Sequence, residues 1–162
     1  MKLNMIQDKR TPDEIAFAQS KHEQTHADLS RVLQRSYNRG CADCQAISPS
    51  WAVLPHGIFV CHHCAQVHRG LGRDISIVKE VTTKTFLWHS DEYQAVARTG
   101  NLRANRIFSG APNAPRKPAA TAPKFERENY IRNKYQQLEW FVAPTGKELE
   151  WFRSPPSGPS PW

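Results

Sequence analysis

The sequence comprises 162 residues with a formal net charge of +7, which suffices for one compact domain with tails and is too short for two domains that each build a core. No run of about 18 apolar residues occurs, and the first ten residues lack the apolar stretch of a secretory signal, so a cytoplasmic protein is expected. The basic residues are dispersed along the chain. Without a polybasic block, charge alone selects neither a nucleic-acid nor a lipid partner.

Residues 1–20 mix charged and small side chains without a sustained apolar stripe, which predicts a flexible N-terminal extension. From about Lys21 the spacing of the apolar side chains predicts an amphipathic helix. These side chains are Leu29, Val32, Leu33 and Tyr37. Asn38-Arg39-Gly40 should end this helix.

The segment between Cys41 and Val81 is typical of short strands and turns, and residues 57–60 and 75–78 are the strongest strand candidates. A helix is then expected to begin at Ser90, whose hydroxyl can cap it, and to close at Gly100. A further turn or two should follow up to Phe108.

Residues 110–123 contain four of the chain's twelve prolines and almost no large apolar side chain, which predicts an extended connector within the domain. Beyond it, the apolar spacing predicts a closing helix from about Lys124 to Val142 that returns to the same core. Residues 143–162 are expected to form a disordered, proline-rich tail. The predicted domain therefore spans residues 21–142.

The four cysteines form two C-x-x-C pairs, Cys41 with Cys44 and Cys61 with Cys64, with 16 residues between the pairs. This spacing allows a hairpin-like excursion to bring four thiolates around one tetrahedral zinc ion. Redox chemistry is the weaker interpretation, because a thioredoxin-type site needs one pair and leaves the other unexplained. Four sulfurs fill the coordination shell, so the zinc ion is expected to be structural and any catalytic group lies elsewhere.

The cysteines alone leave the use of such a module open. His62 and His63 lie inside the second pair and could replace a cysteine, but with four thiolates available we interpret them as exposed or supporting groups. GATA-like and ribbon-like DNA-binding modules also use paired C-x-x-C units with a similar gap. The neighbouring residues must therefore separate protein binding from nucleic-acid binding.

Short motifs surround the cysteines and continue beyond them. They are Asn38-x2-Cys41-Ala42-Asp43-Cys44, Pro49-x-Trp51-Ala52, Gly57-x-Phe59-x-Cys61-x2-Cys64, His68-Arg69-x-Leu71-Gly72, Ile75-Ser76-x-Val78, Gly100-Asn101-x2-Ala104-Asn105 and Ile131-Arg132-x-Lys134-Tyr135. Together they resemble the Arf GTPase-activating (ArfGAP) domain over roughly residues 21–142. The spacing from Cys64 to Arg69 is also the family's own.

The resemblance implies an α+β fold in which a small three-stranded sheet carries the four-cysteine zinc module and several helices flank it. It also implies a monomeric activator of GTP-bound Arf-family small GTPases, with zinc as its cofactor and peripheral recruitment to Golgi or endosomal membranes in vesicle traffic. Arg69 would be the arginine finger, a planar guanidinium that neutralises charge on the transferred phosphoryl oxygens. From spacing alone, a surface arginine that caps its own helix is an equal alternative.

Three further residues are candidates for partner binding. Trp51 matches a family tryptophan near the catalytic arginine, and it is expected to hold the Arg69 loop or to touch the GTPase. Ile75 and Lys84 are the other two, although packing inside the domain is the alternative for Ile75. Phe59 is expected in the core.

Departures from the family pattern motivate rival hypotheses. Pro55 stands where the family often has asparagine, and Thr83-Lys84-x-Phe86 replaces the usual Leu-Asp-x-Trp, so that Lys84 reverses a local charge. A non-catalytic interaction module with the same fold is therefore an alternative. A zinc-dependent nucleic-acid binder, suggested by an isoelectric point of about 9.5, is the weaker one, and no nucleic-acid partner is expected.

Overall fold

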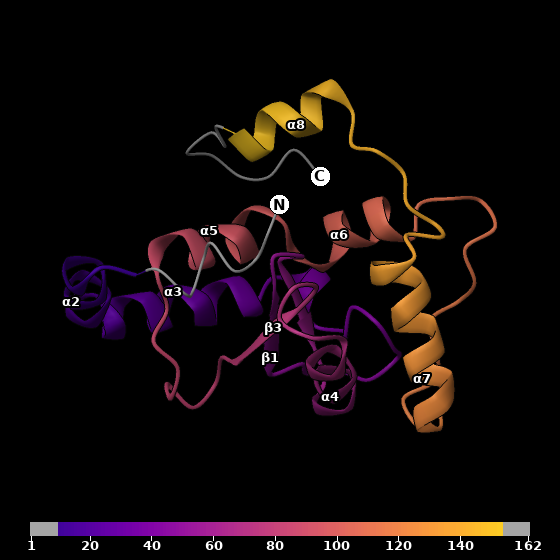
Figure 1. The fold of residues 1–162 in the computed structure, drawn as a ribbon, viewed down its shortest axis with the longest axis horizontal. Coiled ribbons are helices and arrows are strands. Elements are labelled where there is room, and N and C mark those ends of the chain that lie inside the picture. The colour runs from indigo at the N-terminus through magenta and orange to yellow at the C-terminus, as the bar shows by residue number, and fades with distance from the viewer. Residues whose placement is uncertain (1–9, 154–162) are drawn as a thin grey trace.

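The computed structural model describes residues 10–153, which form a small antiparallel sheet surrounded by helices (Figure 1). In chain order the elements are α2 Pro12–Ser20, α3 His22–Leu33, the 3-10 helix η1 Ser36–Asn38, β1 Trp51–Leu54, β2 Ile58–Val60, α4 His62–Leu71, β3 Ile77–Glu80, α5 Ser90–Arg98, α6 Gly100–Phe108, α7 Lys124–Ile131, the π-helix η2 Arg132–Gln136 and α8 Gly146–Arg153. The expected α+β fold is confirmed. Across residues 10–153, every helix is too short or too polar to cross a membrane.

The sheet has the order β2-β1-β3, with β1 antiparallel to both neighbours. Trp51, at the start of β1, pairs with Val60 on one side and with Glu80 on the other. Gly57 in the β1–β2 turn has φ +72, and a Cβ atom there would lie 2.5 Å from the carbonyl oxygen of Ala95. Only glycine fits this turn, because both the backbone conformation and the approach of α5 exclude a side chain.

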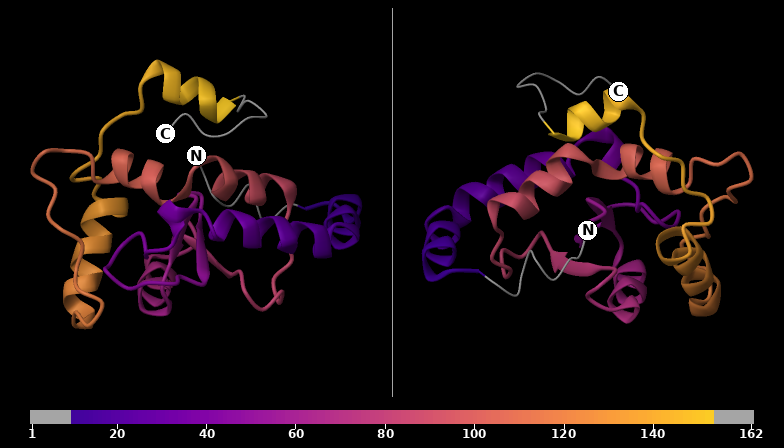
Figure 2. Two further views of the ribbon diagram at one scale, coloured as in Figure 1. Left: turned by 180° about the vertical axis from the view of Figure 1, so that it is seen from behind. Right: turned by 45° about the horizontal axis from the view of Figure 1, so that its top comes forward.

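Side chains alternate across the sheet and divide the core into two clusters. Val53, Ile58 and Val60 face a cluster that contains the cysteines and residues of α4, α6 and η2. Ala52, Leu54 and Phe59 face a second cluster built with α3 and α5. This period of two is the ordinary consequence of the extended backbone, and it confirms that Phe59 is a core residue. Figure 2 shows α3 beside α5 at one end of the molecule and α7 near the other end, where it packs against α4.

The predicted first helix is confirmed as α3, although it ends at Leu33. Asn38 follows in a buried position, where its side-chain amide donates to the carbonyl oxygen of Val32 at 2.8 Å and its side-chain oxygen accepts from the backbone N–H of Asn101 at 2.9 Å. The next predicted helix also exists, but the residue that caps it is His89 instead of Ser90. Gly100 has φ +74 and begins α6 instead of closing α5.

A buried ion pair joins β3 to α5. Lys79 Nζ lies 2.8 Å from Glu92 Oε1 and also donates to the carbonyl oxygen of Leu87 at 2.7 Å. The backbone N–H of His89 donates to the same carboxylate at 2.9 Å. Burial lowers the pKa of Lys79, although the Glu92 carboxylate opposes that shift. The pair therefore fixes the loop between β3 and α5 against the sheet.

Glu92→Gln is expected to lower the free energy of unfolding by about 3–5 kcal/mol, because it leaves the buried Lys79 ammonium without its counter-charge. Urea denaturation followed by circular dichroism measures the change. The matched control is Glu23→Gln, which breaks the exposed Glu23–Lys84 ion pair and should leave the urea midpoint unchanged. Equal midpoint shifts for the two variants would contradict the role of burial.

The region expected to be a flexible N-terminal extension contains the helix α2. Thr11 and Glu14 form a capping box at its start, and Arg10 donates to both carboxylate oxygens of Asp91 on α5 at 2.8 and 2.9 Å. Ala18 is the one buried residue of α2, so its sequence carries no apolar stripe that could reveal it. Residues 1–9 lie outside the described residues, and the flexibility of the extension stays a prediction.

The predicted connector runs past the cysteine loop without helix or strand, with turns at residues 111–114 and 119–122. The backbone N–H of Gln45 donates to the carbonyl oxygen of Pro118 at 2.9 Å, and Lys117 Nζ donates to the carbonyl oxygen of Cys41 at 2.8 Å. The side-chain amide of Gln45 also donates to the carbonyl oxygen of Lys117 at 3.0 Å. The connector is therefore held against the cysteine loop by both backbone and side-chain hydrogen bonds.

The closing helix is shorter than predicted. The helical path stops at Gln136, Leu138 adopts φ +54, and Trp140 forms an isolated bridge with Ser109. Pairing with the end of α6 thus replaces the last helical turn. In the region expected to be a disordered tail, residues 146–153 form α8 instead, which Thr145 and Glu148 cap. Residues 154–162 lie outside the described part of the chain.

Candidate functional site

The sulfur atoms of Cys41, Cys44, Cys61 and Cys64 lie within 4.8 Å of one another. The first two cysteines belong to the loop after η1, Cys61 is the N-cap of α4, and Cys64 lies in the first turn of that helix. Backbone N–H groups of Asp43 and Cys61 approach Cys41 Sγ at 3.4 and 3.3 Å, and that of Ala46 approaches Cys44 Sγ at 3.3 Å. Four thiolates that converge on one point, with backbone donors behind them, fit a tetrahedral zinc ion.

Positive charge is also present at the cluster. Arg127 of α7 is buried, and its Nη1 atom lies 3.5 Å from Cys64 Sγ. Its Nη2 atom donates to the carbonyl oxygen of Ala120 at 3.1 Å. Because four thiolates carry two more charges than one zinc ion neutralises, a guanidinium at this position stabilises the loaded site. Arg127 thereby joins the connector and α7 to the metal centre.

The helix α4 presents one polar side to solvent. It buries Cys64, Ala65, Val67 and His68, whereas Arg69 is exposed. The guanidinium carbon of Arg69 lies 5.2 Å from the ring centroid of Trp51, a cation–π contact. The structure thus brings Arg69 and Trp51 together at the edge where β1 and α4 meet.

The other partner-binding candidates lie on two loops. Ile75 is partly buried in the turn between α4 and β3, where its backbone N–H donates to the carbonyl oxygen of Gly72 at 3.1 Å. Lys84 points toward α3, and its Nζ atom lies 2.9 Å from Glu23 Oε2. The residue of this loop that contacts Trp51 is Phe86, whose ring centroid lies 6.3 Å from that of Trp51. The charge of Lys84 is therefore engaged by α3, and an aromatic side chain borders the Arg69–Trp51 pair.

The structure also reveals a buried polar cluster to which sequence reasoning gave no role. Asp43 Oδ1 accepts hydrogen bonds from Lys134 Nζ at 2.8 Å and from the Tyr135 hydroxyl at 2.6 Å, and its Oδ2 lies 2.7 Å from His68 Nε2. His68 Nδ1 is in turn 2.9 Å from the Ser76 hydroxyl. Burial alone would raise the pKa of Asp43, but the Lys134 charge and the His68 hydrogen bond hold it well below its ordinary value. In the sequence, the only indication that these residues matter is that Asp43, His68 and Lys134 belong to the short motifs shared with the ArfGAP domain.

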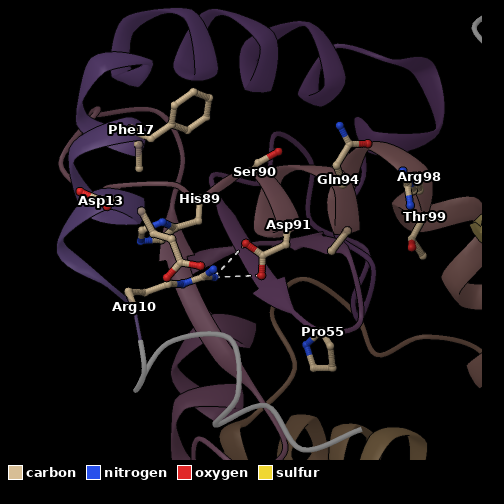
Figure 3. A pocket seen from close by; sticks show the side chains of 13 residues that line it. Arg10, Asp13, Phe17, Pro55, His89, Ser90, Asp91, Gln94, Arg98 and Thr99 are labelled. Atoms are coloured by element: carbon tan, nitrogen blue, oxygen red, sulfur yellow. Dashed lines mark hydrogen bonds and ion pairs between the residues drawn. The ribbon is translucent and has the colours of Figure 1, made fainter.

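A separate hollow of about 910 Å³ lies between α2 and α5 (Figure 3). The Arg10–Asp91 ion pair crosses it, and Phe17 and Pro55 add apolar surface. Neither the cysteines nor Arg69 line this hollow, so it is not part of the candidate site.

Comparison with protein families decides the classification. Residues 26–144 match the ArfGap family, described as "Putative GTPase activating protein for Arf". The chain belongs to the ArfGAP family. Its four clustered cysteines are the four-cysteine zinc site of that family, which confirms zinc as the cofactor.

Individual relatives agree with this membership. Stromal membrane-associated protein 1 of Mus musculus is 35% identical over 136 residues, covering 81% of this chain and 30% of the relative. The ADP-ribosylation factor GTPase-activating protein AGD12 of Arabidopsis thaliana is 39% identical over 116 residues, covering 70% of this chain and 34% of the relative. The chain thus spans about a third of the length of these curated relatives.

Among solved structures, the "ArfGap domain of HIV-1 Rev binding protein" superposes with a TM-score of 0.68 at 21% identity, covering 86% of this chain and 99% of the other. At this identity the likeness establishes the fold alone. The resemblance is therefore confirmed in its family and its fold, the family match covers residues 26–144, and the roles of single residues are matters for proposal.

Proposed function

We propose that this ArfGAP domain stimulates GTP hydrolysis by an Arf-family small GTPase and that Arg69 is its arginine finger. The observation that carries the proposal is the exposed Arg69 guanidinium, held on Trp51 by a helix whose first turn contains a zinc ligand. A group placed in this way can be delivered to another protein without disturbing its own core. The zinc ion would be structural and would not contact the nucleotide, because four cysteines would fill its four coordination positions.

The mechanism follows from the charge that develops during phosphoryl transfer. The domain docks on the GTP-bound GTPase, and Arg69 approaches the γ-phosphate with its guanidinium still packed on the face of Trp51. Its forked N–H donors bind phosphoryl oxygens on which negative charge grows in the transition state. The GTPase itself orients the attacking water. The four cysteines would hold a zinc ion that keeps the cysteine loop and the start of α4 rigid, which would support the orientation of Arg69.

Docking would use the surface around the Arg69–Trp51 pair. Trp51 and Ile75 would supply apolar area there, and Lys84 would exchange its exposed partner Glu23 for an acidic group of the GTPase. The net charge of +7 would favour peripheral contact with anionic Golgi or endosomal membranes, where Arf proteins act in traffic. We propose that one copy of the domain acts on one GTPase.

Single-turnover hydrolysis of GTP preloaded on a panel of Arf proteins, with and without the zinc-loaded domain, tests the proposal. Acceleration of about 10³–10⁵-fold for at least one Arf protein is expected. Nucleotide-dependent binding without acceleration would instead support the non-catalytic interaction module. The departure from the family pattern at Thr83–Phe86 is the reason for considering that alternative. If no Arf protein responds and the domain binds nucleic acid with an affinity that falls steeply with salt, the result would support a zinc-dependent nucleic-acid binder.

Trp51→Ala is expected to lower kcat/KM for Arf-bound GTP about 2- to 30-fold, because a cation–π contact contributes about 0.5–2 kcal/mol to the orientation of Arg69. Trp51→Phe keeps an aromatic face and should retain more of the activity. His63→Ala is the control, since His63 is exposed on the same helix. Unchanged kcat/KM for Trp51→Ala would show that Trp51 neither positions Arg69 nor contacts the GTPase.

A further inference from the structure

The last turn of α4 carries Arg69, yet the zinc site holds only the first turn of this helix. Cys61 caps the helix and Cys64 lies in its first turn, whereas His68 and Arg69 lie in the last. The chain then passes through Gly70 to Gly72, which has φ +93. A helix end of this kind frays unless a side chain fixes it. Leu71 packs partly against the core, but it offers no directional bond.

His68 supplies the directional bonds. Its side chain is fully buried, and both ring nitrogens have partners: Nε2 with Asp43 Oδ2 at 2.7 Å and Nδ1 with Ser76 Oγ at 2.9 Å. Asp43 lies between two zinc ligands in the cysteine loop, and Ser76 immediately precedes β3. The imidazole therefore ties the last turn of α4 to the cysteine loop on one side and to the start of β3 on the other. Two anchors restrict both the position of this turn and its rotation about the helix axis.

The partner of His68 is itself fixed. Lys134 Nζ and the Tyr135 hydroxyl both donate to Asp43 Oδ1, at 2.8 and 2.6 Å. Lys134 also donates to the carbonyl oxygen of Ala42 at 3.1 Å and to Asn105 Oδ1 at 2.6 Å. The carboxylate thus has little freedom to rotate. A rigid acceptor of this kind gives His68 one orientation.

We propose that His68, held by Asp43, is a positioning residue for Arg69. The inference rests on the proposed function, and it assigns to His68 the task of fixing the helical turn from which the guanidinium projects. In this proposal Arg69 contacts the reacting phosphate, whereas His68 affects the reaction only by positioning Arg69. Loss of the His68–Asp43 bond lets the last turn rotate or fray, so that Arg69 samples orientations that miss the γ-phosphate. A displacement of about 1 Å can lower a rate by about 10²-fold.

Two substitutions at His68 separate its two hydrogen bonds. The glutamine side-chain amide reaches the place of Nε2 and can still donate to Asp43, whereas the shorter asparagine amide reaches the place of Nδ1 and keeps only Ser76. His68→Asn is expected to lower kcat for Arf-bound GTP about 10- to 100-fold with KM within about twofold. His68→Gln should stay within about threefold of the unmutated domain, which is rescue by the conservative variant.

A double variant tests whether His68 acts through Arg69. In the background of Arg69→Ala, His68→Asn should cause no further loss, because no guanidinium remains to be positioned. Val32→Ala is the control for general destabilisation, since it truncates a buried side chain of α3 in the second core cluster and should leave kcat unchanged. Losses that multiply in the double variant would overturn the proposal.

A measurement on the free domain needs no GTPase. The ¹⁵N heteronuclear NOE of the Arg69 Nε–Hε group should fall in zinc-loaded His68→Asn and stay near the unmutated value in His68→Gln. An unchanged NOE in His68→Asn would also overturn the proposal. If His68→Asn does not retain zinc, Tyr135→Phe replaces it, because it removes one of the two side-chain donors that fix Asp43 Oδ1 and should lower both the rate and the NOE in the same direction. Should the unmutated domain fail to accelerate any Arf protein, the proposed function falls while the NOE still decides the positioning.

Discussion

Arg69→Lys is expected to reduce the acceleration of GTP hydrolysis by about 10³-fold, close to the loss caused by removing the side chain altogether. Lysine keeps the positive charge but presents it as a compact ammonium on a flexible stem. The guanidinium presents planar, forked donors that bind two phosphoryl oxygens together and that also lie flat on the face of Trp51. The rate constant for single-turnover hydrolysis of Arf-bound GTP, at saturating domain, measures the effect.

The control for this prediction is Arg31→Lys, because Arg31 is exposed on α3 and pairs locally with Asp28. It should leave the rate unchanged. The affinity of Arg69→Lys for the GTP-bound Arf protein should stay close to that of the unmutated domain, because the finger acts in the transition state and contributes little to docking. Full activity of Arg69→Lys would show that Arg69 is not an arginine finger and would leave it at most a role in docking.

Removal of zinc is expected to abolish the cooperative unfolding transition of the domain. A structural zinc site contributes about 10–16 kcal/mol to folding, which is comparable to the entire stability of a typical domain, about 5–15 kcal/mol. Here the cysteine loop, the start of α4 and the α7 residue Arg127 all meet at the four sulfurs. Chelation should therefore release the connector together with the cysteine loop. Circular dichroism during thermal unfolding, with and without a chelator, measures the change.

Acidification should have the same effect as chelation, because zinc binds thiolates and each proton that returns to a sulfur weakens the site. Cys64→Ser should lower the zinc content of the purified domain from one ion per chain. The control is the pair His62→Ala and His63→Ala, which tests the alternative ligands and should retain the full zinc content. Zinc loss in the histidine variants, or full retention in Cys64→Ser, would contradict the assignment of the four cysteines as the zinc ligands.

Local patterns in the sequence were sufficient for the elements that bury one side. Leu29 and Val32 recur at helical spacing and predict α3, and residues 57–60 predict β2. The strand β1 was not among the expected strands. Trp51–Leu54 lies at the centre of the sheet and contacts core on both faces, so its four apolar residues show no alternation. The helix α2 was missed because it depends on a capping box and on the Arg10–Asp91 contact in place of an apolar stripe. The helix α8 was missed because the neighbouring prolines and polar residues are typical of a disordered tail, although Thr145 and Glu148 cap its start.

The site shows the same division. The distance along the chain from Cys64 to Arg69 is a local quantity, so the sequence could indicate both a metal ligand and an exposed arginine on one short helix. Whether Lys84 reverses the charge beside Arg69, as the sequence suggested, depends on how the loop that carries Lys84 folds. In the structure Lys84 pairs with Glu23, and Phe86 is the residue that reaches Trp51.

The amino-acid sequence by itself determined the four zinc ligands, the family and the short helix that bears Arg69, because these depend on spacing between near neighbours. The tertiary structure alone decided that Asp43 meets His68, Lys134 and Tyr135. Those contacts join residues up to 92 positions apart, and they exist only once α4 and η2 both pack around one buried carboxylate. A buried charge requires partners, but which residues supply them is set by the packing of distant elements.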